Sequence, residues 1–420
     1  MYFLADVHSM YCSVEQSFRP DLRNRPVVVA SNGDGVIVAC NRRARELGIV
    51  KFNFVAHYQH LFDSGKCTLF SSNYRLYQEV SDRLIACLTK QQIFTSIAPY
   101  SIDELFGQLP SCITKYEDYL TLARRLRRAA WDEIKLPIGI GGGVTFTLSK
   151  AASFIGKKVE GYRGICVITD DNLELLSRVP VGDVWNVGKA TAAILKRQGI
   201  YTALDLRRCS PDDGRSWGGV NLERTIRELR GEKVFSIDAS FPDAESRKEV
   251  SSSISLTIRA ESALELHQAL SERIAIAAEK LRKLELTARS MVLFAQNSRF
   301  DREPQHFKTQ VIYEYPVDDT RVLITSLSSN FSDLYKCGIR YYKIGCRLIG
   351  LEPTKHQQTD LFAPPQKPQL MQAVDALNKK FGYRAISVGS QRVDSQSKML
   401  RNHLSPNYLS EWKDIPRIKC

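Results

Sequence analysis

The sequence contains no long hydrophobic run, no internal repeat and no low-complexity block. Without about 18 consecutive apolar residues, no segment is expected to span a membrane. The N-terminal segment MYFLADVHSM lacks a basic region and places Asp6 where a signal peptide needs an apolar core, so we expect no signal peptide. These absences favour a cytoplasmic protein.

Paired cysteines are also absent. The ten cysteines are scattered singly, with no CxxC pair and no Cys/His cluster at zinc spacing. This pattern argues against a structural zinc site and a disulfide framework, and it favours reduced thiols in a reducing compartment.

Acidic residues are outnumbered by basic ones. The chain has 59 Lys and Arg against 46 Asp and Glu, a net charge of +13, which favours a polyanionic partner such as nucleic acid. The basic excess lies mostly in residues 1–167 and 351–420. With 420 residues, 43% hydrophobic and 25% charged, the chain is expected to fold into two to four globular domains.

Short apolar runs alternate with helical patterns over the first 167 residues. The runs predict strands at Tyr2–Val7, Val27–Ala30, Val36–Ala39, Phe94–Ile102, Leu105–Leu109 and Pro137–Gly141. Apolar spacing predicts helices at Met10–Phe18, Arg42–Leu47, Tyr74–Leu88 and Tyr119–Ile134. The alternation is typical of a mixed α/β layer structure.

The rest of the chain divides at a linker predicted at residues 236–248. Residues 175–235 are helical and polar, whereas residues 249–350 alternate in a way that predicts a second, α+β domain. Its predicted elements are strands at Val250–Ile258, Ala288–Ala295, Thr309–Tyr315 and Arg340–Leu348 and helices at Ser262–Leu284 and Arg321–Leu334. The last 70 residues are expected to form a connector and a basic tail with weak helical structure.

A glycine-containing turn precedes the predicted helix Ala190–Gln198. Two short helices joined there would expose the backbone N–H groups of Gly188 and Lys189 near a helix N-terminus, which is a site for a phosphate. The same stretch also fits an ordinary loop before a helix, and its spacing leaves both interpretations open.

Three carboxylates lie in apolar strand patterns. Asp6 closes the first strand, and Asp103 and Glu104 interrupt the run from Tyr100 to Phe106. A buried carboxylate needs a counter-charge or becomes neutral. If the two strands are neighbours, the acids converge and can hold Mg²⁺ ions of the kind that catalyse phosphoryl transfer. Taken singly, each acid also fits a strand end in solvent.

The residues around these acids resemble the signature motifs of the Y-family translesion DNA polymerases. The two motifs are Asp6-Val-His-Ser-Met-Tyr11-Cys-Ser-Val-Glu15 and Tyr100-Ser-Ile-Asp103-Glu104. Further stretches are similar to the UmuC branch, the catalytic subunits of bacterial DNA polymerase V: Ser71-Ser-Asn-Tyr74, Pro180-Val-Gly-Asp-Val-Trp185 and Leu222-Glu-Arg-Thr-Ile-Arg-Glu-Leu-Arg-Gly231. The motifs occur in the family's order over most of the chain.

The resemblance implies a multidomain α/β and α+β right-hand polymerase. Its parts would be a ferredoxin-like palm (1–23 and 73–167), small fingers (24–72), a thumb with a helix-hairpin-helix (168–235), an α+β little finger (243–350), and a clamp-binding motif with a basic C-terminal tail (351–420).

The resemblance also implies roles for individual residues. Asp6, Asp103, Glu104 and the Val7 carbonyl would bind two Mg²⁺ ions, with Mn²⁺ able to substitute. Tyr11 would be the steric gate that excludes a ribose 2′-OH, although its spacing also fits a core aromatic. Arg45 and Lys157 would bind the triphosphate, although isolated basic residues are more often solvated.

Three stretches depart from the family pattern. Arg42 stands where many members have a tyrosine that contacts phosphate, and Phe146 stands where lysine is common. The triple glycine Gly141–Gly143 is expected to weaken its strand and to alter packing beneath the site. In the fingers, residues 51–55 (KFNFV) replace a stretch that usually contains Gly and Pro, so contacts to the templating base are expected to differ.

The resemblance extends to DNA and protein partners. Gly188 and Lys189 would grip the primer–template duplex through phosphate, and residues 249–350 would bind it without reading its sequence. The motif Gln358-Thr-Asp-Leu361-Phe362 resembles the pentapeptide that docks to the sliding clamp, with Leu361 and Phe362 as apolar anchors; a chance match in a linker is the alternative. A UmuD-like dimer and the RecA filament are further implied partners.

These inferences predict an error-prone, Mg²⁺-dependent DNA polymerase that copies past damaged bases in the SOS response, in the bacterial cytoplasm at the nucleoid. One alternative is a clamp-tethered DNA-binding scaffold with impaired catalysis, which the triple glycine makes conceivable. Another is a palm-fold nucleotidyl cyclase, which would need neither primer nor template but would leave the predicted thumb hairpin and clamp motif unexplained.

Overall fold

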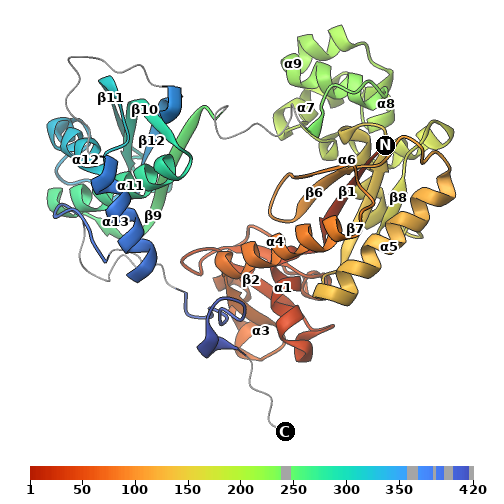
Figure 1. The fold of residues 1–420 in the computed structure, drawn as a ribbon, viewed down its shortest axis with the longest axis horizontal. Coiled ribbons are helices and arrows are strands. Elements are labelled where there is room, and N and C mark those ends of the chain that lie inside the picture. The colour runs from red at the N-terminus through yellow and green to blue at the C-terminus, as the bar shows by residue number, and fades with distance from the viewer. Residues whose placement is uncertain (238–246, 357–367, 382–384, 392–400, 416–420) are drawn as a thin grey trace. The chain divides into compact units, whose positions relative to one another are not determined.

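The computed structural model describes residues 1–237, 247–356, 368–381, 385–391 and 401–415 (Figure 1). The chain forms two compact units, Met1–Phe241 with Arg401–Cys420, and Pro242–Leu400. Each unit has hydrophobic cores of its own, as expected of domains. Within the described residues, no helix is both long and apolar enough to cross a membrane.

The first unit is built on a five-stranded sheet in the order β5-β6-β1-β7-β8. The strands are β1 (Tyr2–Val7), β5 (Ser96–Pro99), β6 (Glu104–Gln108), β7 (Ile138–Gly143) and β8 (Ile165–Val167). Central β1 is buried along its length, and its side chains alternate between the two faces. Phe3 packs toward α4 (Tyr74–Lys90) and α5 (Tyr116–Ile134), whereas Leu4 belongs to the core that includes Phe146 of α6 (Phe146–Lys158). Burial on both faces explains why β1 is almost entirely apolar.

The triple glycine lies in β7, directly against α6. A Cβ on Gly141 would lie 2.3 Å from the backbone oxygen of Ser149, and one on Gly143 would lie 2.6 Å from the backbone nitrogen of Ser149. We expected these glycines to weaken the strand. The structure shows that their missing side chains allow the helix backbone to contact the sheet.

A smaller sheet, in the order β3-β2-β4, lies in the same unit. It comprises β2 (Val27–Ala30), β3 (Ile37–Cys40) and β4 (Thr68–Ser71), with the short helices α2 (Arg42–Glu46) and α3 (Gln59–Asp63). Helix α1 (Met10–Phe18) connects the large sheet to this one and contacts α4. Strands β4 and β8 and helices α3 and α6 have no counterpart among the predicted elements.

The helical part of the first unit follows β8. It contains the 3-10 helices η3 (Asp170–Arg178) and η4 (Val181–Asp183) and the helices α7 (Lys189–Arg197), α8 (Ala203–Arg208) and α9 (Pro211–Leu229). Helix α9 kinks at Gly219, whose φ of 70° suits glycine.

The second unit is an antiparallel four-stranded sheet in the order β11-β10-β12-β9. Its elements are β9 (Glu249–Ala260), α11 (Ala263–Lys283), β10 (Leu286–Gln296), β11 (His306–Val317), α12 (Thr320–Ser329), β12 (Tyr341–Pro353) and α13 (Pro368–Phe381). Their order matches the α+β domain expected from the sequence. The Arg282 guanidinium of α11 donates two hydrogen bonds, of 2.7 and 2.8 Å, to the Asp375 carboxylate of α13 and so holds this helix within the unit.

Candidate active site

The three predicted carboxylates lie on or next to adjacent strands: Asp6 is in β1, Glu104 begins β6, and Asp103 directly precedes it. Strands β1 and β6 pair antiparallel with Asp6 opposite Glu104, and the Val7 N–H donates to the Asp103 carbonyl oxygen at 2.9 Å. Residues 6–7 and 103–104 therefore meet at one end of this strand pair, as the sequence predicts for neighbouring strands.

Asp6, which is buried, and Glu104, which is half-buried, each have a lysine partner from α6. Lys157 forms an ion pair with Asp6, and Lys150 Nζ lies 2.8 Å from Glu104 Oε2. Asp103 is half-buried and accepts a hydrogen bond of 2.6 Å from Ser101 Oγ. The two lysines are seven residues apart, two helical turns, so both face the carboxylate edge.

Burial dominates the electrostatics of Asp6. Desolvation raises the pKa of Asp6 to about 6; Lys157 opposes this shift, and the charges of Glu104 and Asp103 add to it. The carboxylate is thus held where its negative charge is costly, and a cation nearby would favour its ionised form.

The donor set fits hard divalent cations in chemistry. Asp6, Asp103 and Glu104 supply carboxylate oxygens, the ligands that Mg²⁺ prefers, and the raised pKa of Asp6 indicates negative charge that is incompletely compensated. Among the described residues, however, no three His, Cys, Asp or Glu side chains already stand together as a metal-ligand cluster. Lysine ammonium groups supply the positive charge at Asp6 and Glu104 instead.

A cavity of about 530 Å³ opens beside these acids and brings together most of the predicted nucleotide site. Its lining includes Asp6, Val7, Tyr11, Arg45, Asp103 and Lys157. Glu104 points instead toward Lys150. An adjoining cavity of about 970 Å³ shares Arg45, Lys157 and Lys158 and adds the basic residues Arg42, Arg43 and Arg163. This concentration of positive charge suits a polyphosphate.

Tyr11 lies on a stack of tyrosines. Its ring is parallel to that of Tyr77, with centroids 4.5 Å apart and an interplanar angle of 14°, and it meets Tyr74 edge to face at 5.7 Å. Tyr77 is fully buried, and its hydroxyl donates to Glu15 at 2.8 Å. The stack fixes the plane of the Tyr11 ring at the cavity wall.

Two residues of this site, Lys150 and His8, are not among those predicted from the sequence. Lys150 lies 4.1 Å from the centre of the Tyr100 ring as well as next to Glu104, and its seven-residue spacing from Lys157 was the available signal. His8 lines both cavities, and burial, with Lys157, Arg127 and Arg45 nearby, lowers its pKa to about 4. Among the described residues, His8 Nε2 has no hydrogen-bond partner.

The structure shows the surroundings of the residues that depart from the family pattern. Phe146 is buried and stacks on Phe106 with centroids 4.2 Å apart, so this position serves an aromatic core. Arg42 is exposed and pairs with Glu46 at 3.1 Å. Phe52, from the divergent fingers stretch, is exposed and also lines the cavity beside Asp6.

The remaining predicted site residues lie elsewhere. Gly188 is the N-cap of α7 and Lys189 is its first residue, so the expected helix N-terminus is present in the helical part after β8. Gln358, Leu361 and Phe362, the predicted clamp-binding residues, lie outside the described residues.

Comparison with known proteins gives matches over the whole chain. Sequence models described as the impB/mucB/samB family and its C-terminal domain match residues 5–154 and 247–361, and a domain of unknown function matches residues 368–418. Protein SamB of Salmonella typhimurium is 34% identical over 432 residues, covering 100% of both chains. The chain belongs to the impB/mucB/samB family.

Further relatives match over nearly the same length. Protein UmuC of Salmonella typhimurium is 34% identical over 429 residues, covering 100% of both chains, and DNA polymerase IV 1 of Bacillus subtilis is 24% identical over 426 residues, covering 98% of both. A solved Y-family DNA polymerase chimera superposes with a TM-score of 0.67 at 16% identity, covering 84% of this chain and 99% of that one. The expected Y-family fold, with palm, fingers, thumb and little finger, is confirmed.

Proposed function

We propose that this chain is an error-prone translesion polymerase of the SOS response that extends a primer by phosphoryl transfer at the Asp6–Glu104 edge. As a member of its family, the chain is a DNA-directed DNA polymerase. One observation carries the proposal: paired β1 and β6 place Asp6 and Asp103 in the same cavity as Tyr11, Arg45 and Lys157. A nucleotide site needs these three elements together: acids, a sugar-facing ring and phosphate-binding cations.

Polymerases of this family use divalent metal ions. We assign two Mg²⁺ ions, or Mn²⁺ in their place, to Asp6, Asp103, Glu104 and the Val7 carbonyl. When bound, such ions stabilise charge on the attacking and leaving oxygens. The chain itself supplies the oxygen ligands, and it holds Lys150 and Lys157 as counter-charges next to them.

The substrate steps follow from the other cavity residues. The primer 3′-OH attacks the α-phosphorus of a dNTP, a new P–O bond forms, and the bond to pyrophosphate breaks. Arg45 and Lys157 would bind the triphosphate, with Lys157 exchanging the Asp6 carboxylate for a phosphate oxygen. Tyr11 would block a ribose 2′-OH. Catalysis then rests mainly on positioning and charge.

We assign the domains of the right-hand polymerase fold to residues 1–23 and 73–167 (palm), 24–72 (fingers), 168–235 (thumb) and 243–350 (little finger). Primer–template DNA would contact the backbone N–H groups at Gly188 and Lys189, because a helix N-terminus attracts phosphate. The net charge of +13 supports such a polyanionic partner.

Further partners are proposed from the motifs and the UmuC-like sequence. Gln358, Leu361 and Phe362 would dock to the sliding clamp, while a UmuD-like dimer and the RecA filament would activate the enzyme. Acting on damaged chromosomal DNA, it would work in the bacterial cytoplasm at the nucleoid.

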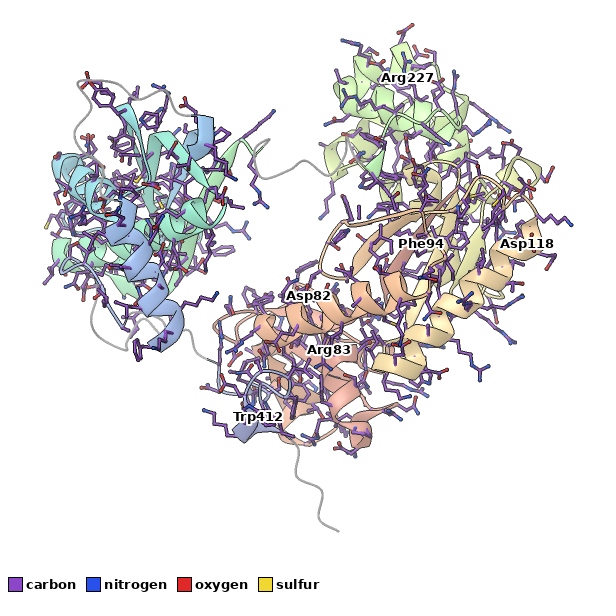
Figure 2. All side chains as sticks on the ribbon, in the orientation of Figure 1. Asp82, Arg83, Phe94, Asp118, Arg227 and Trp412 are labelled. Carbon is purple, nitrogen blue, oxygen red and sulfur yellow. The ribbon has the colours of Figure 1, made fainter. Side chains whose placement is uncertain are left out.

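Primer extension tests this function. Extension on undamaged and abasic templates is measured with Mg²⁺ and four dNTPs, adding the UmuD-like partner, RecA and the clamp stepwise. Asp103→Ala should lower extension at least about a hundredfold, because a proposed ligand of the metal ions that stabilise the transition state is lost, and should leave DNA affinity nearly unchanged. Asp118→Ala is the control, since Asp118 is exposed on α5 (Figure 2).

Two results would contradict the proposal. Retained extension by Asp103→Ala would show that the metal assignment is wrong. No incorporation in any mixture, by a protein that still binds DNA, would support the scaffold function instead.

A further inference from the structure

The C-terminal segment 401–415 lies against the small sheet and α4 of the first unit. Its backbone extends β4: the Ser71 N–H donates to the His403 carbonyl oxygen at 2.9 Å, and the His403 N–H donates to Ser71 Oγ at 3.0 Å. The Asn73 side-chain amide donates to the Ser405 carbonyl oxygen at 3.0 Å. The segment is therefore held by hydrogen bonds between residues that are more than 330 positions apart in the sequence.

Two further contacts anchor this segment. The Tyr408 ring stacks on Phe18 of α1 with centroids 4.8 Å apart and an interplanar angle of 15°. Arg75 of α4 pairs with Glu411 at 3.2 Å. Contacts to both α1 and α4 place the segment over the junction of these two helices.

One carboxylate beneath the segment is fully buried. Glu15 Oε1 accepts hydrogen bonds from Ser405 Oγ at 2.9 Å and from the Tyr77 hydroxyl at 2.8 Å. Its other oxygen, Oε2, has no partner among the described residues. Because a buried carboxylate depends strongly on its few donors, Ser405 is a substantial part of what holds Glu15 in place.

The same carboxylate is connected to the cavity wall. Glu15 and Tyr11 are four residues apart on α1 and thus share one helix face. Tyr77, held at its hydroxyl by Glu15, stacks directly on the Tyr11 ring. A continuous path of contacts runs from Ser405 through Glu15 and Tyr77 to Tyr11.

We propose that Ser405, Glu15 and Tyr77 are positioning residues for sugar selection, through which the C-terminal segment holds the Tyr11 ring against a ribose 2′-OH. The proposal rests on the proposed role of Tyr11 as the steric gate. It assigns a task to part of the region matched by the domain of unknown function. The Tyr11 ring can keep its orientation only if the Tyr77 ring beneath it is held in place. The hydrogen bond from the Tyr77 hydroxyl to Glu15 holds that ring.

The test is the ratio of kcat/KM for a dNTP to that for the matching rNTP, measured in the full chain with its accessory proteins. Ser405→Ala and Tyr77→Phe should each lower this ratio about two- to tenfold, the range for the loss of one hydrogen bond. Ser405→Thr, which keeps the hydroxyl, should restore most of it. A general loss of folding would lower both kcat/KM values and leave their ratio unchanged.

Two variants calibrate the measurement. Tyr11→Ala must lower the ratio if the gate is correctly assigned. Trp412→Ala is the control within the same segment, because Trp412 is 91% exposed and extends from the segment (Figure 2).

The outcomes separate the two proposals. If Tyr11→Ala lowers the ratio while Tyr77→Phe and Ser405→Ala do not, the positioning role is wrong and the gate stands. If Tyr11→Ala leaves the ratio unchanged, the gate is wrong and the positioning role falls with it. An equal effect of Trp412→Ala would also overturn the path through Ser405. If Ser405→Ala abolishes extension, the ratio measured for Tyr77→Phe tests the positioning role: a lowered ratio supports it and an unchanged ratio overturns it.

Discussion

Glu15→Gln should change how the stability of the first unit depends on pH. Burial raises the pKa of Glu15 from its ordinary 4.5 to about 7, against the hydrogen bonds from Tyr77 and Ser405 and the charge of Arg19, which lower it. The folded unit therefore binds the proton more tightly than the unfolded chain, so stability falls as pH rises through this window. At about 1.4 kcal/mol per pH unit, the full loss is about 3 kcal/mol.

Urea unfolding measures this loss. All four tryptophans, Trp131, Trp185, Trp217 and Trp412, belong to the first unit, so their fluorescence reports the unfolding of the unit that contains Glu15. Between about pH 5 and about pH 8, the wild type should lose about 2 to 3 kcal/mol more than Glu15→Gln, which cannot ionise.

The difference between the wild type and Glu15→Gln cancels the contribution of the other titrating groups to the pH dependence of stability. Asp6, whose pKa is raised to about 6, and His8, whose pKa is lowered to about 4, contribute equally to both proteins. Glu117→Gln is a control because Glu117 is exposed on α5. Parallel pH profiles for the wild type and Glu15→Gln would refute the reasoning, since they would show that the pKa of Glu15 is not raised in the folded unit.

Three further predictions concern packing and charge. Lys150→Ala should lower primer extension about tenfold through kcat, because Glu104 loses its counter-charge, while Lys150→Arg should retain most activity and DNA binding should be unchanged in both. Gly141→Ala should lower the free energy of unfolding by about 3 kcal/mol in urea, because a Cβ there overlaps the backbone of α6. Arg282→Met should expose α13 to limited proteolysis, because its bidentate contact with Asp375 is lost.

Each of these has a contradicting result. Unchanged kcat in Lys150→Ala would remove that lysine from the site, and a Gly141→Ala protein as stable as the wild type would show that α6 can move away from β7. Equal cleavage of α13 in Arg282→Met and in the wild type would show that apolar packing of the helix is sufficient.

The local pattern of apolar and polar residues was sufficient to predict many of the strands and helices. The predicted strand Tyr2–Val7 and helix Met10–Phe18 have the same bounds in the structure, because alternation on a buried strand and 3.6-residue spacing on a helix are properties of adjacent residues. The convergence of Asp6 with Asp103 and Glu104 was predictable on the condition that the two strands are neighbours, and the structure meets that condition because β1 pairs with β6. Strand β4 was missed because only half of it is buried, and α6 because the glycines before it mask its start.

Tertiary structure decided which partners these residues have. The choice of Lys150 and Lys157 as counter-charges depends on α6 packing against the triple glycine, and Ser405 reaches Glu15 across 390 residues of sequence. A buried charge is stabilised by whichever donors the folded chain brings within about 3 Å, and periodicity carries no information about contacts at that separation. The chain's own sequence therefore specifies the carboxylate edge, while the fold specifies how that edge is neutralised and how the Tyr11 ring is supported.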